Sequence, residues 1–112
     1  MQRNIMIAGL TTAALLGALA ASIGLTAVAT ADATASKTGY TKNCVLCHGP
    51  TGKPPASVKS PDFSSVAWQK SVTDTKLVAV IENGAGSMPG YKKSLKPELI
   101  RGIVVHIRGM AK

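Results

Sequence analysis

The sequence predicts a small helical domain over residues 32–112, with short helices separated by loops. Two segments carry apolar residues at the three- and four-residue spacing of a helix face. Stretches rich in glycine and proline lie between the predicted helices and are typical of loops. The sequence shows no alternation of strand and helix patterns that would indicate βαβ units. These observations favour a helical domain over an α/β domain.

The segments 73–83 and 97–109 carry the clearest helix signals. Thr73 and Asp74 are typical of a helix start, because a hydroxyl caps the first turn and a carboxylate suits its positive end. Pro97 is tolerated at the first position of the next helix, where its missing N–H is not needed. The expected buried residues are Leu77, Val80 and Ile81 in the first helix, and Ile100, Ile103, Val104 and Ile107 in the second.

A further helix is predicted from about residue 35 to residue 47, and it leads into the motif Cys44-Val45-Leu46-Cys47-His48. This is C-x-x-C-H, the attachment signature for c-type haem. The two thiols lie on one side of a helical turn, where both can bond one haem, and His48 follows at once as the proximal iron ligand. A redox dithiol or half of a zinc site is the alternative. The chain holds only two cysteines and two histidines, which argues against zinc.

After the motif, residues 49–55 can only form a loop. We expect a backbone carbonyl of Pro54 or Pro55 to accept the second ring N–H of His48 and so to fix its tautomer. Phe63 and Trp68 follow in further loop, and we expect both to pack in the core.

Met88 is the predicted second axial ligand, through its thioether sulfur. It lies in a glycine-rich loop outside any helical stripe, and Pro89 biases its backbone to an extended conformation. Met110, close to the end of the sequence, is a poor rival. His106 stays open as an alternative ligand, although a packed helix histidine is the expected role.

Residues 1–31 are typical of a secretory signal peptide: Arg3 is followed by an uncharged apolar stretch and by the small-residue site Ala29-Thr30-Ala31. The uncharged stretch is also long enough to remain as a membrane anchor. Either outcome places residues 32–112 outside the cytoplasm, in the periplasm. Membrane attachment is expected only if residues 1–31 are retained.

The chain has 13 Lys and Arg against 5 Asp and Glu, and only Arg3 of these lies before residue 32. The basic surface suits redox partners with acidic docking surfaces, and Lys92, Lys93 and Lys96 follow closely on Met88. An exported chain without a basic run is not expected to bind nucleic acid. With one Phe, one Trp and two Tyr, the core is thin. Burying roughly 500 Å² of haem at about 25 cal/mol per Å² would add on the order of 10 kcal/mol, so the haem-free chain should be largely unfolded.

The order of C-V-L-C-H-G, a Pro-rich loop, P-D-F, a helix ending in N-G, S-M-P-G-Y and a final apolar helix resembles the small class I cytochromes c of bacteria. The resemblance covers residues 35–110. It implies an all-α cytochrome c fold, with three to four short helices and loops around one covalently bound haem c. It also implies crossed terminal helices. By position, it makes Cys44 and Cys47 the thioether links and His48 and Met88 the axial ligands. Two positions depart from the family: Ser36 replaces a frequent glycine, for which Gly102 is a candidate substitute, and His106 replaces an aromatic residue.

The expected function is that of a periplasmic one-electron carrier, because a haem with both axial positions filled exchanges electrons through its edge. The main alternative is a cytochrome c subunit of a larger membrane or periplasmic oxidoreductase complex. A gas sensor, in which Met88 dissociates, is a third possibility. The domain is too small to hold a substrate site as well, and it is not expected to be an enzyme on its own.

Overall fold

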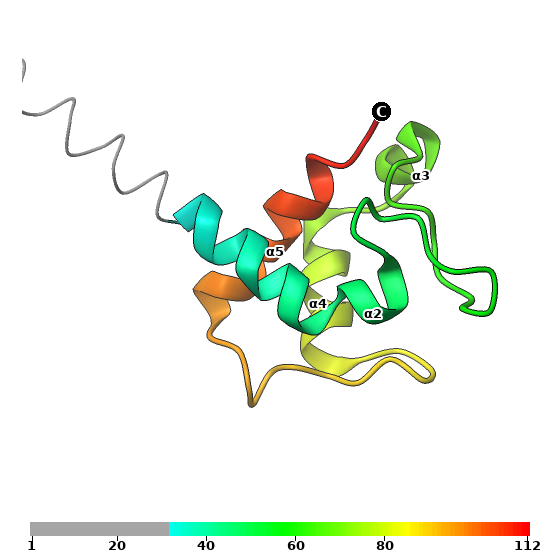
Figure 1. Cartoon of the computed structure of the whole chain (residues 1–112). Coiled ribbons are helices and arrows are strands. Elements are labelled where there is room, and N and C mark those ends of the chain that lie inside the picture. The colour runs from blue at the N-terminus through cyan, green and yellow to red at the C-terminus, as the bar shows by residue number, and fades with distance from the viewer. Residues whose placement is uncertain (1–31) are drawn as a thin grey trace, which may run out of the picture.

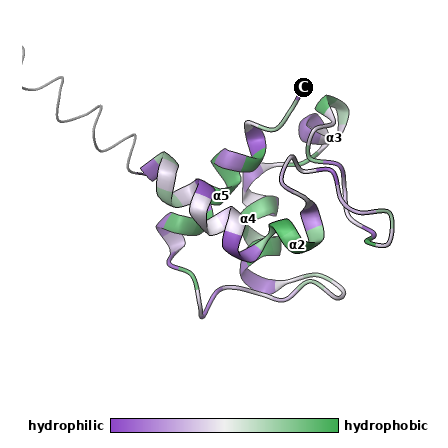
Figure 2. Ribbon diagram, viewed as in Figure 1, coloured by the Kyte–Doolittle hydropathy of each residue, from purple (hydrophilic) through white to green (hydrophobic). Residues whose placement is uncertain are grey.

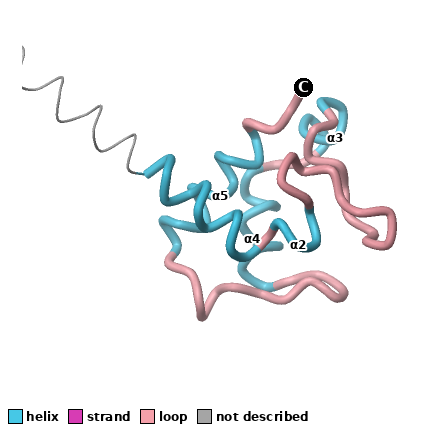
Figure 3. Tube along the Cα trace, in the orientation of Figure 1, coloured by secondary structure: helices cyan, strands magenta, loops and turns pink. Residues whose placement is uncertain are grey.

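The computed structural model describes residues 32–112, which form helices and loops (Figures 1 and 3). An N-terminal helix covers residues 32–43. It is followed by α2 (Val45–His48), α3 (Val66–Ser71), α4 (Asp74–Asn83) and α5 (Pro97–Arg108). Within the described range the only strand-like pairing is an isolated bridge between Ala85 and Met88. The predicted all-α class is confirmed, whereas the expected signal peptide or anchor at residues 1–31 lies outside the described residues.

Two helix boundaries differ from the prediction. The helix expected to run to residue 47 is interrupted at Cys44, where a turn separates residues 32–43 from α2. The second difference is α3, a helix that holds Trp68 where the sequence predicts a loop. Ser65 caps α3, since its side chain accepts a hydrogen bond from the Trp68 N–H at 3.2 Å. A helix of six residues has too few turns to show an apolar period, so its sequence signal is weak.

The predicted starts of the two longer helices are confirmed. The Thr73 side chain accepts from the Lys76 N–H at 3.1 Å and caps α4, and Pro97 opens α5. At its other end, α4 stops at Gly84, which has a φ of 77° that few other residues adopt.

The N-terminal helix crosses α5 at small side chains (Figure 1). A Cβ on Gly102 would collide with the Ser36 side chain, and one on Gly39 would press on Leu99 and Ile103 at 3.1–3.2 Å. Gly102 therefore allows the two helices to approach closely, although Ser36 stands where the family often has glycine. Both helices contribute to one hydrophobic core, which consists of Tyr40, Phe63, Leu77, Ile81, Ile100, Ile103, Val104, Ile107 and Met110.

Helices α4 and α5 pack on each other and carry most of the predicted apolar faces inward. All four residues of the α5 stripe are buried, and so are Leu77 and Ile81 of α4, while Val80 is half-buried. None of the helices in the described range is long and apolar enough to cross a membrane.

Candidate haem site

The two thiols of the motif lie at the start of α2 and within it: Cys44 directly precedes the helix, and Cys47 is part of it. Both cysteines are free: Cys44 is half-buried against the core, and Cys47 is exposed. Burial raises the pKa of the Cys44 thiol to about 11, so this group is neutral at physiological pH. The helical turn is closed by the His48 N–H, which donates to the Cys44 carbonyl at 2.9 Å. Cys44, Cys47 and His48 thus lie within one helical turn of the chain, in a segment that Figure 2 shows to be largely hydrophobic.

His48 is held from two directions. Its Nδ1 lies 2.7 Å from the Ser60 hydroxyl oxygen, and its ring stacks on Phe63 with the centroids 4.7 Å apart and the planes at 21°. Burial lowers the pKa of His48 below its ordinary value, which favours the neutral imidazole that a metal requires. The expected partner at Pro54 or Pro55 is therefore wrong. The loop makes two turns after those prolines: the Val58 N–H donates to the Pro55 carbonyl, and the Ser60 N–H donates to the Val58 carbonyl. These turns bring Ser60, and neither proline, to the His48 ring.

Behind Phe63 lies a network of polar side chains that ties three elements together. Trp68 also stacks on Phe63, with the ring centroids 5.1 Å apart. The buried Gln69 side chain donates to the carbonyls of Phe63 (2.7 Å) and Ile107 (2.9 Å). Arg108 donates in turn to the Gln69 backbone and side-chain oxygens at 2.6 and 2.9 Å. The position of the Phe63 backbone therefore depends on α3 and on the end of α5.

Tyr40 anchors the residue that follows the motif. We expected Tyr40 to share a face with Cys44, and its backbone carbonyl does accept from the Cys44 N–H at 2.8 Å. The Tyr40 ring is almost fully buried, and its hydroxyl donates to the Gly49 carbonyl at 2.7 Å. Burial raises the pKa of Tyr40 to about 12, which keeps the donor protonated. The exit of the chain from α2 is thereby fixed to the N-terminal helix.

Met88 lies in a loop that backbone hydrogen bonds hold against α4. The N–H of Met88 donates to Ala85 at 2.9 Å and the N–H of Ala85 to Met88 at 3.1 Å, while the N–H of Tyr91 donates to Ile81 at 2.8 Å. The Met88 side chain is half-buried and packs on the core. At Gly84, a Cβ would meet the Met88 carbonyl oxygen at 2.5 Å, so this tight loop needs glycine there.

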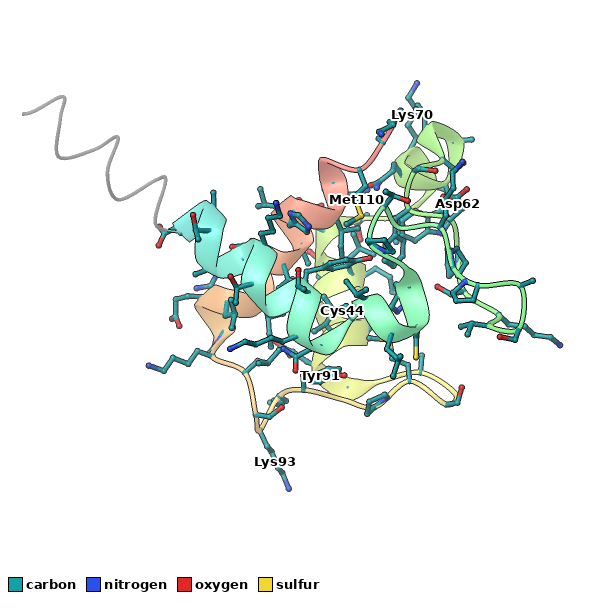
Figure 4. The ribbon with its side chains drawn as sticks, viewed as in Figure 1. Cys44, Asp62, Lys70, Tyr91, Lys93 and Met110 are labelled. Atoms are coloured by element: carbon teal, nitrogen blue, oxygen red, sulfur yellow. The ribbon has the colours of Figure 1, made fainter. Side chains whose placement is uncertain are left out.

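Tyr91 joins this loop to the end of the N-terminal helix. Its hydroxyl donates to the Asn43 carbonyl at 3.1 Å, directly before Cys44. Figure 4 shows Tyr91 close to Cys44, while Lys93 projects away from the ribbon. Burial raises the pKa of Tyr91, and negative charge on the two cysteine sulfurs adds to the effect. The effect of the sulfurs on the Tyr91 pKa would be lost once both form thioether bonds, because a thioether carries no charge.

The two alternative ligands occupy other places in the fold. His106 packs against the Tyr40 ring at the helix crossing, with the centroids 5.1 Å apart. Burial, with the nearby positive charge of Lys37, lowers its pKa. The Met110 sulfur lies beside Gly52, where a Cβ would be 2.9 Å from it, and the side chain is buried in the core. The packing of His106 agrees with the role expected from the sequence, and Met110 is part of the core.

These residues fit a haem. The donors are two free thiols, a neutral imidazole whose Nδ1 is already hydrogen-bonded, and a thioether on a loop that is tied to Asn43, directly before Cys44. Among the described residues, no three or more Cys, His, Asp or Glu side chains gather as a metal-binding group. Ser60, Gln69 and Tyr91 had not been singled out as site residues, because nothing in their local sequence indicates partners 12 to 48 residues away.

Comparisons with known proteins agree with this site. The family model described as cytochrome C oxidase, cbb3-type, subunit III matches residues 31–107. Among solved structures, the KustC0563 c-type cytochrome superposes with a TM-score of 0.66 at 27% identity, covering 69% of this chain and 98% of that one. Cytochrome c6 of Leptolyngbya boryana is 27% identical over 77 residues, which is 69% of this chain and 91% of the relative. Fold, motif and relatives thus define a small class I c-type cytochrome, whose cofactor is covalently bound haem c.

The chain belongs to the cytochrome c family of cbb3-type oxidase subunit III. The FixP subunit of the cbb3-type oxidase of Bradyrhizobium sp. (strain ORS 278) is 31% identical over 80 residues, or 70% of this chain. The CcoP subunit of Azospirillum sp. (strain B510) is 30% identical over 80 residues, or 66% of this chain. The aligned part makes up only 28% and 27% of the length of these two subunits.

Proposed function

We propose that this cytochrome is an exported one-electron carrier in which Cys44 and Cys47 bind the haem through thioether bonds. His48 and Met88 are the proposed axial ligands of the iron. The observation that carries the assignment is the joining of both ligand segments: Tyr91, three residues after Met88, is hydrogen-bonded to Asn43, next to Cys44. When bound, the haem supplies an iron that alternates between the ferric and ferrous states.

The protein's own residues would hold that iron and limit what it can do. The His48 ring is oriented by Ser60 and Phe63, and Met88 is brought up by a loop whose backbone is bonded to α4. A haem iron held by both His48 and Met88 would have no position left for oxygen or peroxide, so electron exchange would be favoured over catalysis.

A potentiometric titration of the purified holoprotein, with visible spectra, tests the ligand set. Wild type should have a clearly positive potential, because a thioether ligand favours ferrous iron. Met88→Ala should lower the potential and open the iron to carbon monoxide, whereas Met110→Leu, which alters a core methionine, should leave both unchanged. A wild-type potential that is already strongly negative, or an unchanged Met88→Ala spectrum, would contradict the assignment.

The second candidate is a subunit of a larger oxidoreductase complex, and the family membership together with the FixP and CcoP relatives favours it. Size-exclusion chromatography of a mild extract from the native cell separates the two roles. A carrier elutes as a small haem protein, and a subunit elutes with a membrane or periplasmic complex. Mass spectrometry of the same material tells whether residues 1–31 were removed on export.

The proposed redox partners have acidic docking surfaces. Lys92, Lys93 and Lys96 are exposed on the segment between the Met88 loop and α5. Replacing all three by Glu should slow reaction with an acidic redox protein and weaken the dependence of the rate on salt. The same exchange at Lys70, on α3, serves as a control, and equal rates for both variants would remove these three lysines from the docking surface.

A further inference from the structure

The loop after α2 returns a serine to the ring of His48. Ser60 lies 12 residues beyond His48, yet its hydroxyl oxygen is 2.7 Å from His48 Nδ1. The Ser60 backbone is held by its own N–H, which donates to Val58 at 3.1 Å. The side chain is half-buried, so the contact is partly shielded from water. Of the hydrogen bonds described for the motif, this is the one that reaches the imidazole.

The direction of this hydrogen bond follows from a second contact. The Ser60 hydroxyl also lies 3.3 Å from the carbonyl oxygen of Pro61, which can only accept. With the hydroxyl proton directed to Pro61, a lone pair of the same oxygen faces His48. His48 then carries its proton on Nδ1 and donates it to Ser60. The Nε2 lone pair is left free, as an iron ligand requires.

Phe63 completes the restraint on the ring. It stacks on the imidazole at 4.7 Å with a tilt of 21°, and its backbone carbonyl is held by Gln69. The ring plane is thus set by Phe63, and the rotation within that plane by Ser60.

We propose that Ser60 is a positioning residue for His48 and that it tunes the reduction potential of the haem iron. The proposal rests on the proposed function, in which His48 ligates the iron. A hydrogen-bond acceptor on Nδ1 makes the imidazole a stronger electron donor, and stronger donation stabilises ferric iron. Without the hydroxyl, His48 donates less electron density to the iron, and the ferrous state becomes more stable relative to the ferric state.

Ser60→Ala in the holoprotein is the direct test, measured by potentiometric titration. We expect the equilibrium constant for reduction to rise about threefold to tenfold, where tenfold corresponds to 59 mV for a one-electron couple. Ser60→Thr keeps the hydroxyl and should restore the wild-type potential. Ser57→Ala is the matched control, because it removes an exposed hydroxyl from the same loop. A Ser60→Ala potential equal to that of Ser57→Ala would overturn the proposal.

A measurement on the wild-type protein keeps the test independent of folding in the variants. In the reduced protein, proton–nitrogen NMR should show a His48 Nδ1–H that exchanges slowly with water, as a hydrogen-bonded proton does. A proton that exchanges as fast as that of a free imidazole would overturn the role of Ser60. Failure of the proposed function would be seen in a different measurement. The wild-type spectrum would then show that His48 does not ligate the iron, independently of the results for the Ser60 variants.

Discussion

The two segments that carry the proposed iron ligands are built in different ways. His48 is held by side chains: Ser60 bonds its Nδ1, and Phe63 stacks on its ring. The loop of Met88 is held by backbone hydrogen bonds to α4 and within itself, with the Tyr91 hydroxyl as its side-chain link to the N-terminal helix. On the His48 side, a point substitution can change one contact and leave the chain path intact. On the Met88 side, the chain path itself sets the position of the sulfur.

The largest expected effect comes from preventing the attachment of the haem, which both ligand segments would contact. In a Cys44→Ala, Cys47→Ala double variant, the haem is not attached covalently, and stabilisation on the order of 10 kcal/mol is at stake. That exceeds or equals the net stability of most small domains, so we expect no cooperative thermal transition by circular dichroism. A melt as sharp as that of the holoprotein would show that the two segments support each other without haem.

Next in size is a change in the backbone path on the Met88 side. Gly84→Ala combines a positive φ with a Cβ only 2.5 Å from the Met88 carbonyl oxygen. We expect Met88 to be displaced and the equilibrium constant for reduction to fall by at least about tenfold, or 59 mV. Gly86→Ala has a similar φ but no atom within 4 Å of the new Cβ. This control should cost about 1–2 kcal/mol of stability and leave the potential unchanged; equal potentials for the two variants would refute the backbone argument.

A smaller effect is expected from the side-chain network behind His48. Gln69→Leu removes two hydrogen bonds to carbonyls and one from Arg108, in a buried place. Leaving these groups without partners should lower the free energy of unfolding by about 2–3 kcal/mol, measured by denaturant titration. Lys70→Leu, the same new residue at an exposed position next along α3, should change it by less than about 0.5 kcal/mol. Similar losses in the two variants would mean that the network does not stabilise this side.

The smallest expected effect is on the pH dependence of stability, and it involves a third region, the crossing of the N-terminal helix with α5. Burial and Lys37 lower the pKa of His106 in the folded protein, so the unfolded chain takes up the proton first as the pH falls. Stability should therefore decline as the pH drops below about 6.5, the ordinary histidine pKa, towards the folded-state pKa. His106→Gln should make the melting temperature less dependent on pH between about 7.5 and 5.5. A variant with the full wild-type dependence would assign the decline to other groups.

The sequence predicted what depends on short separations. The thiol spacing, the α5 stripe, the Thr73 cap and the end of α4 before Gly84 involve residues a few positions apart, and a helix brings such residues together wherever it forms. The proposed ligand set, Cys44, Cys47, His48 and Met88, rests on the same kind of signal and remains a prediction.

Tertiary structure alone decided the contacts that orient those residues. The hydroxyl of Tyr91 reaches Asn43 across 48 residues, and Arg108 reaches Gln69 across 39. The partner of His48 was expected at Pro54 or Pro55 and is Ser60, because the path of an irregular loop depends on which turns it contains and on what it packs against. Helix propensity and apolar period carry no information about such contacts. They become defined only when the N-terminal helix, α3 and α5 are packed around one core.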